Sequence, residues 1–252
     1  FRTTLIHGRN EMLRGLYSVA GALEIAGRNH EVVAENLANI ATPGYRRQGT
    51  FFDMSQFASN STSTTSQPNA RPPRASQFTY VDGGPLQQTN NPLDLALVGN
   101  AYFVLDSPSG PVYTRNGSFE IGPGGELQAR GSGYRVRGQG SQISLPQNVS
   151  SIEVAADGTI SANGAPLGRL ELASFAQTDS LQRVGPTLFQ GTAPQTPTPG
   201  SYRIEQGFKE GSNVQAVQEM VTMMVGMRHY EAAQRSMRAI SEAVAQNTRT
   251  QS

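Results

Sequence analysis

The sequence predicts an α+β protein in which long N- and C-terminal helices form a coiled-coil stalk that carries a mainly antiparallel, all-β middle domain. Two observations indicate this arrangement. Apolar residues near both ends repeat with alternating steps of three and four, and short apolar runs separated by turn residues fill the middle. The predicted parts are a helical domain from residues 12–41 and 207–250, an extended connecting segment over 42–90, and a β-rich domain over 91–206.

The N-terminal helix is predicted to run from Met12 to about Ala41. Its apolar seam consists of Leu13, Leu16, Ala20, Leu23, Gly27, His30, Ala34 and Leu37, and Val33 broadens the same face. Residues 1–11 show no such pattern, so we expect the helix to begin at Met12. The spacing continues past Glu24, which argues against a cleavable signal peptide in this stretch. Because several seam residues are small or polar, this helix needs packing partners.

The C-terminal helix repeats the alternation and adds a second apolar stripe. Its seam consists of Met223, Gly226, Tyr230, Ala233, Met237, Ile240 and Val244, and its second stripe consists of Val217, Met220, Val221, Met224 and Met227. The preceding Gly211-Ser212-Asn213 is typical of a helix N-cap. The two terminal helices are expected to pack on each other. Since that pairing leaves apolar surface uncovered, we also expect further chains on the helices.

The middle of the chain shows the features of an all-β domain. Its predicted strands are Leu93–Val98, Tyr102–Leu105, Val112–Thr114, Ser118–Ile121, Tyr134–Val136, Ile152–Val154, Leu170–Phe175 and Tyr202–Ile204. Asn116-Gly117, Asp157-Gly158 and Asn163-Gly164 are dipeptides typical of two-residue hairpin turns. No helical period interrupts these runs.

Composition and motifs argue against an enzyme or a ligand-binding protein. The chain has 252 residues, a net charge of +1 and no cysteine, which excludes disulfides and Cys-ligated metals. His7, His30 and His229 lack metal-ligand spacing, and no phosphate-binding or nucleophile motif is present. We therefore predict no catalytic residues, no cofactor, no metal, no small-molecule substrate and no nucleic-acid partner.

The segment ENLANIATPGYRRQGTFF, residues 35–52, changes abruptly from helical to extended character. Pro43 has no amide hydrogen and disfavours helix at the residue before it. Gly44 permits the backbone to turn. The sequence therefore predicts a firm helix end at this point.

This segment also resembles a known signature. Bacterial flagellar axial proteins, the rod and hook group, carry Asn-x-Ala-Asn-x-x-Thr-Pro-Gly-Tyr. The matching residues are Asn36, Leu37, Ala38, Asn39, Thr42, Pro43, Gly44 and Tyr45. The resemblance continues in NPLDLALVGNAYFVL, YTRNGSFEI and GFKEGSNVQAVQEMVTMMVGMRHYE, in family order. It is greatest for the proximal rod type, with the distal rod type a close second and the longer hook subunit less similar.

The resemblance implies a structural subunit that polymerises helically into the drive shaft carrying torque from motor to hook. The terminal helices would form an inner coiled-coil layer, with the β domain outside. Its partners would be copies of itself, other rod and hook proteins, and the flagellar type III export apparatus. The location would be the basal body, spanning the periplasm and cell envelope after export. The competing interpretation from the residues alone is a secreted β-rich cell-wall-binding module.

The residues after the signature have two interpretations. Arg46 and Arg47 can pair with carboxylates on a neighbouring subunit, and Phe51 and Phe52 can bury in an inter-subunit groove. Alternatively, the segment is a surface loop whose phenylalanines complete the core of their own subunit. The sequence leaves both open.

Overall fold

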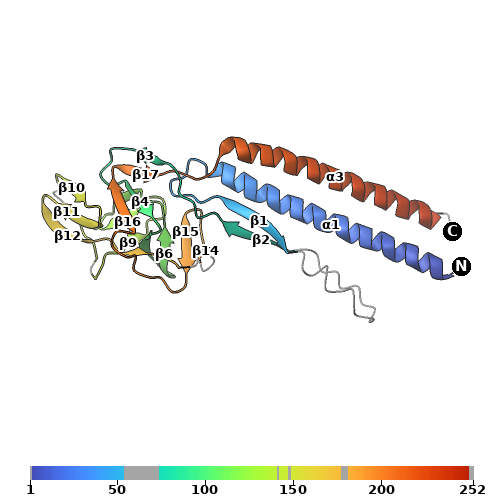
Figure 1. Cartoon of the computed structure of the whole chain (residues 1–252), viewed down its shortest axis with the longest axis horizontal. Coiled ribbons are helices and arrows are strands. Elements are labelled where there is room, and N and C mark those ends of the chain that lie inside the picture. Colours follow the sequence, from blue (N-terminus) through green and yellow to red (C-terminus); the bar gives the residue numbers. More distant parts are fainter. Residues whose placement is uncertain (1, 54–73, 141, 147–148, 177–180, 250–252) are drawn as a thin grey trace. The chain divides into compact units, whose positions relative to one another are not determined.

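The computed structural model describes residues 2–53, 74–140, 142–146, 149–176 and 181–249. It has the predicted α+β composition with a β-rich middle (Figure 1). The chain divides into two compact units. The helical unit comprises Phe1–Ala38, Gln48–Tyr80 and Gln215–Ser252, and the β unit comprises Asn39–Arg47 and Val81–Val214. This division differs from the predicted domains, because the chain passes between the units several times instead of once in each direction.

The described part of the helical unit contains helix α1 (Arg2–Ala38) and helix α3 (Ala216–Arg249), which lie antiparallel and side by side (Figure 1). Helix α1 begins before the predicted Met12, because residues 2–11 contain no proline and only one glycine to interrupt a helix. Helix α3 begins at Ala216, within the predicted helical segment 207–250 but after the predicted cap at Gly211-Ser212-Asn213. Within the described residues, no helix is long and apolar enough to cross a membrane.

Helix α3 packs on α1 through most of the predicted seam. Met223, Met237, Ile240 and Val244 are half-buried, whereas Tyr230 is 40% exposed. The alternation of three and four residues therefore identifies the face of α3 that packs inside the unit. Met224, from the second stripe, lies on the exposed side of the same helix.

The buried face of α1 is broader than the predicted seam. Val32 and Val33 are buried and Leu23 is half-buried, but the seam residue His30 is exposed. The buried face is broader than the seam because α1 packs against strand β1 as well as α3. The side chains of the predicted seam residues Leu13 and Leu16 lie outside the described part.

A β-hairpin completes the helical unit. Strand β1 (Gln48–Asp53) pairs antiparallel with β2 (Arg74–Thr79), and both strands contact α1. Part of the predicted connecting segment is therefore folded secondary structure. Thr50, Phe51 and Phe52 are residue types that are enriched in strands.

The β unit is entirely antiparallel in its described strand pairs. It contains a sheet of order β14-β15-β6-β5-β9-β8-β7, with β13 on β5, a three-stranded sheet β10-β11-β12, and the pairs β16-β4 and β17-β3. The strands are β3 (Leu86–Gln88), β4 (Leu95–Gly99), β5 (Tyr102–Ser107), β6 (Gly110–Thr114), β7 (Phe119–Ile121), β8 (Leu127–Ala129), β9 (Arg135–Val136), β10 (Ile152–Val154), β11 (Thr159–Ala162), β12 (Ala165–Arg169), β13 (Leu172–Ala173), β14 (Leu181–Arg183), β15 (Leu188–Gly191), β16 (Tyr202–Gln206) and β17 (Phe208–Glu210).

Two of the dipeptides predicted to form hairpin turns join paired strands, and the third does not. Asp157-Gly158 lies in the turn between β10 and β11, and Asn163-Gly164 forms the two-residue turn between β11 and β12. Asn163 and Gly164 both have positive φ, as that tight turn requires. Asn116-Gly117 is not a hairpin turn, because the flanking strands β6 and β7 are not neighbours.

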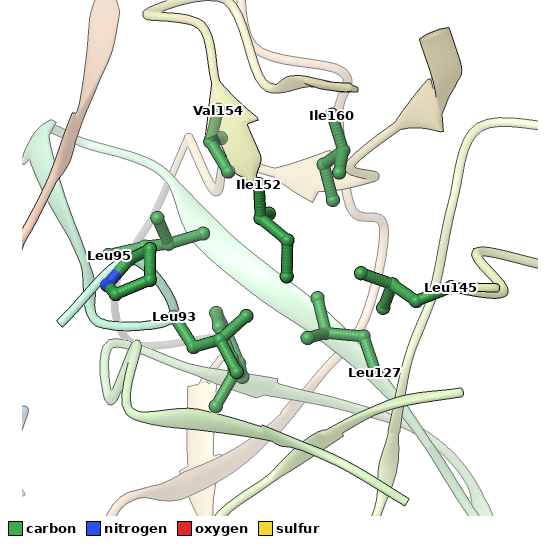
Figure 2. Close-up of a pocket in the computed structure, with 9 residues that line it drawn as sticks. Leu93, Leu95, Leu127, Leu145, Ile152, Val154 and Ile160 are labelled. Carbon is green, nitrogen blue, oxygen red and sulfur yellow. The ribbon is translucent and has the colours of Figure 1, made fainter. Parts of the chain in front are cut away.

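Strand β5 is buried on both faces and divides the core of the β unit. Phe103 and Leu105 face the larger cluster, while Tyr102 and Val104 face a smaller one. This alternation follows from the two-residue period of a strand. A cavity of about 10 Å³ lies in the larger cluster and is lined entirely by apolar side chains, proline included. Figure 2 shows the residues that line it. So small and apolar a cavity is a packing void, not a ligand site.

Candidate functional site

The signature residues that follow α1 form a compact turn within the β unit. The Thr42 amide donates to Asn39 O at 3.1 Å, and the Tyr45 amide donates to Thr42 O at 3.2 Å. The Thr42 hydroxyl lies 3.2 Å from Asn39 Oδ1. Pro43, which has no amide hydrogen to donate, occupies the position between these two bonds. The signature therefore encodes a local turn that ends helix α1.

Position 44 requires glycine for two reasons: its backbone conformation, and the close approach of another backbone segment. Its φ is +69°, in the region that favours glycine. A Cβ at this position would lie 2.3 Å from the backbone nitrogen of Asn116. The Gly44 amide donates to Glu210 O at 2.8 Å. A larger residue would separate these backbone segments.

Replacing Gly44 with alanine should destabilise the β unit more than the same change at Gly133. Gly133 has nearly the same φ, +68°, but no atom within 4 Å of an added Cβ. We expect Gly133→Ala to cost about 1–2 kcal/mol of unfolding free energy from conformation alone. Gly44→Ala should cost about 2 kcal/mol more, because backbone must move. Urea unfolding of both variants measures the difference, and equal losses would contradict the close contact.

Tyr45 is fully buried beneath an arginine of the same unit. The guanidinium carbon of Arg183 lies 4.4 Å from the centroid of the Tyr45 ring. Arg183 also donates through Nη1 to Arg46 O at 3.0 Å and through Nε to Gly185 O at 3.0 Å. Arg183 therefore covers the ring and fixes the backbone that follows it.

Glu210 joins three segments that are distant in sequence. Its Oε1 lies 2.6 Å from Arg46 Nη1 and accepts a hydrogen bond from the Gly84 amide at 3.0 Å. Its Oε2 lies 3.8 Å from Arg115 Nε. The side chains of Glu210, Arg46 and Arg115 are all buried. We call these residues, with Gly44 and Asn213, the Glu210 junction.

Arg115 anchors the junction to the sheet. It donates to Leu97 O at 3.3 Å and to Gly99 O at 2.5 Å. Its guanidinium lies 5.3 Å from the centroid of the Tyr102 ring. Burial lowers the pKa of Arg115 from its ordinary value, and the charge of Glu210 opposes this shift. The junction thus holds two buried arginines against one carboxylate.

Asn213 fastens the chain where it leaves the β unit. Its Oδ1 accepts from the Arg47 amide at 2.6 Å, and its Nδ2 donates to Asp82 O at 2.9 Å. Ser212 Oγ accepts from the Val214 amide at 3.2 Å. The prediction that Gly-Ser-Asn caps α3 is therefore wrong, because the helix begins only at Ala216 and these side chains bind elsewhere.

The residues predicted to contact neighbouring subunits have different environments. Arg46 is only 1% exposed and pairs with Glu210 of its own chain, so we correct its assignment to an intrachain ion pair. Arg47 is half-buried. Phe51 is 51% exposed and its ring centroid lies 6.4 Å from that of Phe78. The side chain of Phe52 lies outside the described part. The inter-subunit role stays a prediction for these last three.

Within the helical unit, Asn36 holds the start of strand β1. Its Oδ1 accepts from the Gln48 amide at 2.8 Å, and its Nδ2 donates to Gln48 O at 2.9 Å. The same Nδ2 lies 3.4 Å from Oε2 of the buried Glu219 on α3. Leu37, its neighbour in the signature, is half-buried. One side chain therefore ties α1, α3 and the hairpin together.

Replacing Asn36 with alanine should destabilise the helical unit. The change leaves a buried amide and carbonyl of Gln48 without their partner, at about 2–4 kcal/mol in total. Asn29→Ala is the control, because Asn29 accepts a single bond from the Thr50 hydroxyl at 3.1 Å. That variant should lose less than about 1 kcal/mol. Unfolding curves for the two proteins separate the outcomes, and similar losses would count against the role of Asn36.

Helix α3 presents an apolar stripe to solvent on the side opposite its seam. The exposed stripe consists of Val217, Met220, Val221, Met224 and Met227, with exposed fractions between 47% and 76%. Their spacing places them along one face of the helix. A contiguous apolar face of this kind marks an interaction surface.

The polar groups of a surface groove in the β unit bind one another. The groove has a volume of about 510 Å³ and includes Asp157, Arg169 and Tyr202. Arg169 donates to Asp157 O at 2.9 Å and to the Tyr202 hydroxyl at 3.1 Å. The Tyr202 hydroxyl donates to Asp157 O at 3.1 Å. Among the described residues, no three histidine or acidic side chains could jointly hold a metal ion.

Sequence reasoning missed the junction residues that lie far from the signature. It predicted carboxylate partners for the arginines, but neither Glu210 nor Arg115 was identified. The available signal was Glu210 itself, which directly precedes the Gly-Ser-Asn segment.

Two family models match the chain. Residues 96–162 match the model described as "Flagellar hook protein FlgE/F/G D1 domain", which covers Arg115. Residues 205–245 match "Flagellar basal body rod FlgEFG protein C-terminal", which covers Glu210, Asn213 and the exposed stripe. The matched segments therefore contain most of the features described above.

Whole-length relatives extend this similarity. The chain is 34% identical over 247 residues to flagellar basal-body rod protein FlgF of Salmonella typhimurium, covering 92% of the chain and 95% of the relative. It is 31% identical over 247 residues to FlgF of Escherichia coli, with the same coverage. It is 30% identical over 246 residues to rod protein FlgG of Buchnera aphidicola, covering 87% and 93%.

Proposed function

This chain belongs to the family of flagellar basal-body rod proteins, and we propose that it forms the proximal part of the rod. It is a structural subunit and not an enzyme, it resides in the flagellar basal body, and it assembles with other rod and hook proteins. The distal part of the rod is the second candidate position, because the relatives include FlgG as well as FlgF.

The exposed stripe of α3 carries the proposal for how the subunit assembles. One face of α3 is covered by α1, so the stripe is available to a second subunit. Burying five such side chains removes several hundred Å² of apolar surface from water, at about 25 cal/mol per Å². Repeated around a helix of subunits, such contacts build a stiff inner layer from terminal helices. In this assembly the helices act as a coiled-coil stalk.

The Glu210 junction supports a mechanical role for the β unit. It binds the segments through which the chain enters and leaves this unit, using an ion pair, several backbone hydrogen bonds and a close glycine contact. Hydrogen bonds and ion pairs are electrostatically stronger in a buried, low-dielectric environment than in water. We infer that torque acting on the chain ends is transferred to a fixed point in the β unit.

We also propose how the subunit is exported and reaches the rod. Subunits would leave the cytoplasm through the flagellar type III export apparatus and fold at the growing tip. The marginal apolar seam of α1 suits this order of events, because it favours helix formation only where partners are present. Free subunits would then remain unpolymerised until they reach the rod.

Quantitative mass spectrometry on purified hook–basal bodies tests the proposal. The protein should be present at a handful of copies per particle relative to the hook subunit, on the order of one helical turn. A few dozen copies would instead assign it to the distal rod. Absence from particles that are otherwise complete would overturn the rod assignment.

A further inference from the structure

The exposed stripe contains three methionines whose sulfurs are accessible in the described part of the chain. The protein has no cysteine and seven methionines. Met220, Met224 and Met227 are 47%, 58% and 51% exposed, whereas Met223 and Met237 are half-buried in the seam against α1. The spacing of the exposed three places their thioethers along one face of the helix. Within one helix, the described structure therefore distinguishes well-exposed methionines from half-buried ones.

We propose that Met220, Met224 and Met227 are oxidative modification sites whose oxidation blocks addition of the subunit to the rod. This inference rests on the proposed role of the stripe in assembly. A peroxide transfers one oxygen to the thioether: its O–O bond breaks, an S–O bond forms, and water is released from hydrogen peroxide. Sulfur is oxidised by two electrons and the peroxide is reduced.

The consequence follows from the polarity of the product. A sulfoxide is a strong hydrogen-bond acceptor, and burying it without a donor is unfavourable. The exposed stripe contains two valines beside the three methionines, and none of these five side chains is a hydrogen-bond donor. Three sulfoxides on this face therefore convert an apolar contact surface into a polar one. The change is reversible while the subunit is free, because methionine sulfoxide reductases use two electrons from a thiol reductant to restore the thioether, and the oxygen leaves as water.

The first test compares oxidation in the free subunit and in the rod. The full-length protein and purified basal bodies are treated with hydrogen peroxide, and sulfoxides are located by peptide mass spectrometry. In the free protein, the three stripe methionines should oxidise about ten-fold faster than Met223 and Met237. In basal bodies, they should be protected by a similar factor. Equal rates for all five methionines, or no protection in the rod, would overturn the inference.

The second test uses variants in cells. The triple change M220Q/M224Q/M227Q reproduces the polarity of the sulfoxides and should reduce incorporation into basal bodies by at least about ten-fold. The triple leucine variant keeps the apolar volume and should assemble normally. Circular dichroism of the purified proteins checks that both variants fold. Normal assembly of the glutamine variant would overturn the inference, whereas absence of the unmodified protein from basal bodies would overturn the proposed function itself.

Discussion

Replacing Glu210 with glutamine should remove about 3–5 kcal/mol from the unfolding free energy of the β unit. Glutamine preserves the shape of the side chain and its hydrogen bond with the Gly84 amide. It removes the negative charge with which Arg46 and Arg115, both buried, form ion pairs. Two buried guanidinium groups would then repel each other without compensation. Urea titration followed by circular dichroism measures the loss.

The control for this prediction is an exposed ion pair in the same unit. Glu120 lies 3.7 Å from Arg130, and both side chains are about half exposed. Glu120→Gln should change stability by less than about 1 kcal/mol. Adding Arg46→Met to Glu210→Gln should recover part of the loss, because it removes one of the uncompensated charges. A loss below about 1 kcal/mol for Glu210→Gln would mean that the arginines reach solvent.

Two lysines in the exposed stripe should prevent assembly without unfolding the subunit. In Met220→Lys/Met224→Lys, both charges meet water in the free protein, and lysine is a good helix former. The free subunit should therefore stay within about 1 kcal/mol of its normal stability. Burying the charges between subunits is costly, so incorporation into basal bodies should fall at least about 100-fold. Cells should lose motility accordingly.

A matched variant places the same residues elsewhere on α3. Gln218 and His229 are exposed and polar, so Gln218→Lys/His229→Lys adds charge to the same helix outside the exposed stripe. This protein should assemble far better than the stripe variant. Basal bodies containing normal amounts of Met220→Lys/Met224→Lys would contradict the assignment of the stripe to an interface.

The helices could be predicted from the sequence because their packing follows a local period. Met223, Met237 and Val244 recur with the spacing of one helical face, and that face packs against α1. The helix ends were less predictable. Asn213 has the chemistry of an N-cap, but its side chain binds Arg47, which is 166 residues distant in sequence. Local propensity does not reveal such long-range partners.

Only the local part of the candidate site could be predicted, because the sequence alone does not show which distant residues come together. The turn at Pro43 and Gly44 follows from the properties of those two residues alone. The ion-pair partner of Arg46 does not follow from the neighbouring residues, because only the folded sheet brings Glu210 and Arg115 beside it. The sequence correctly indicated that Arg46 needs a carboxylate. It could not indicate that the carboxylate belongs to the same chain.

We infer that the exposed stripe contacts neighbouring subunits, whereas the turn formed by the signature residues stabilises its own chain. Site-specific photo-crosslinking in purified basal bodies tests this most directly. A photo-reactive phenylalanine analogue at position 224 should join the protein to another rod or hook subunit on irradiation. A subunit that incorporates normally but shows no intermolecular product from position 224 would contradict the assignment of the exposed stripe to an interface.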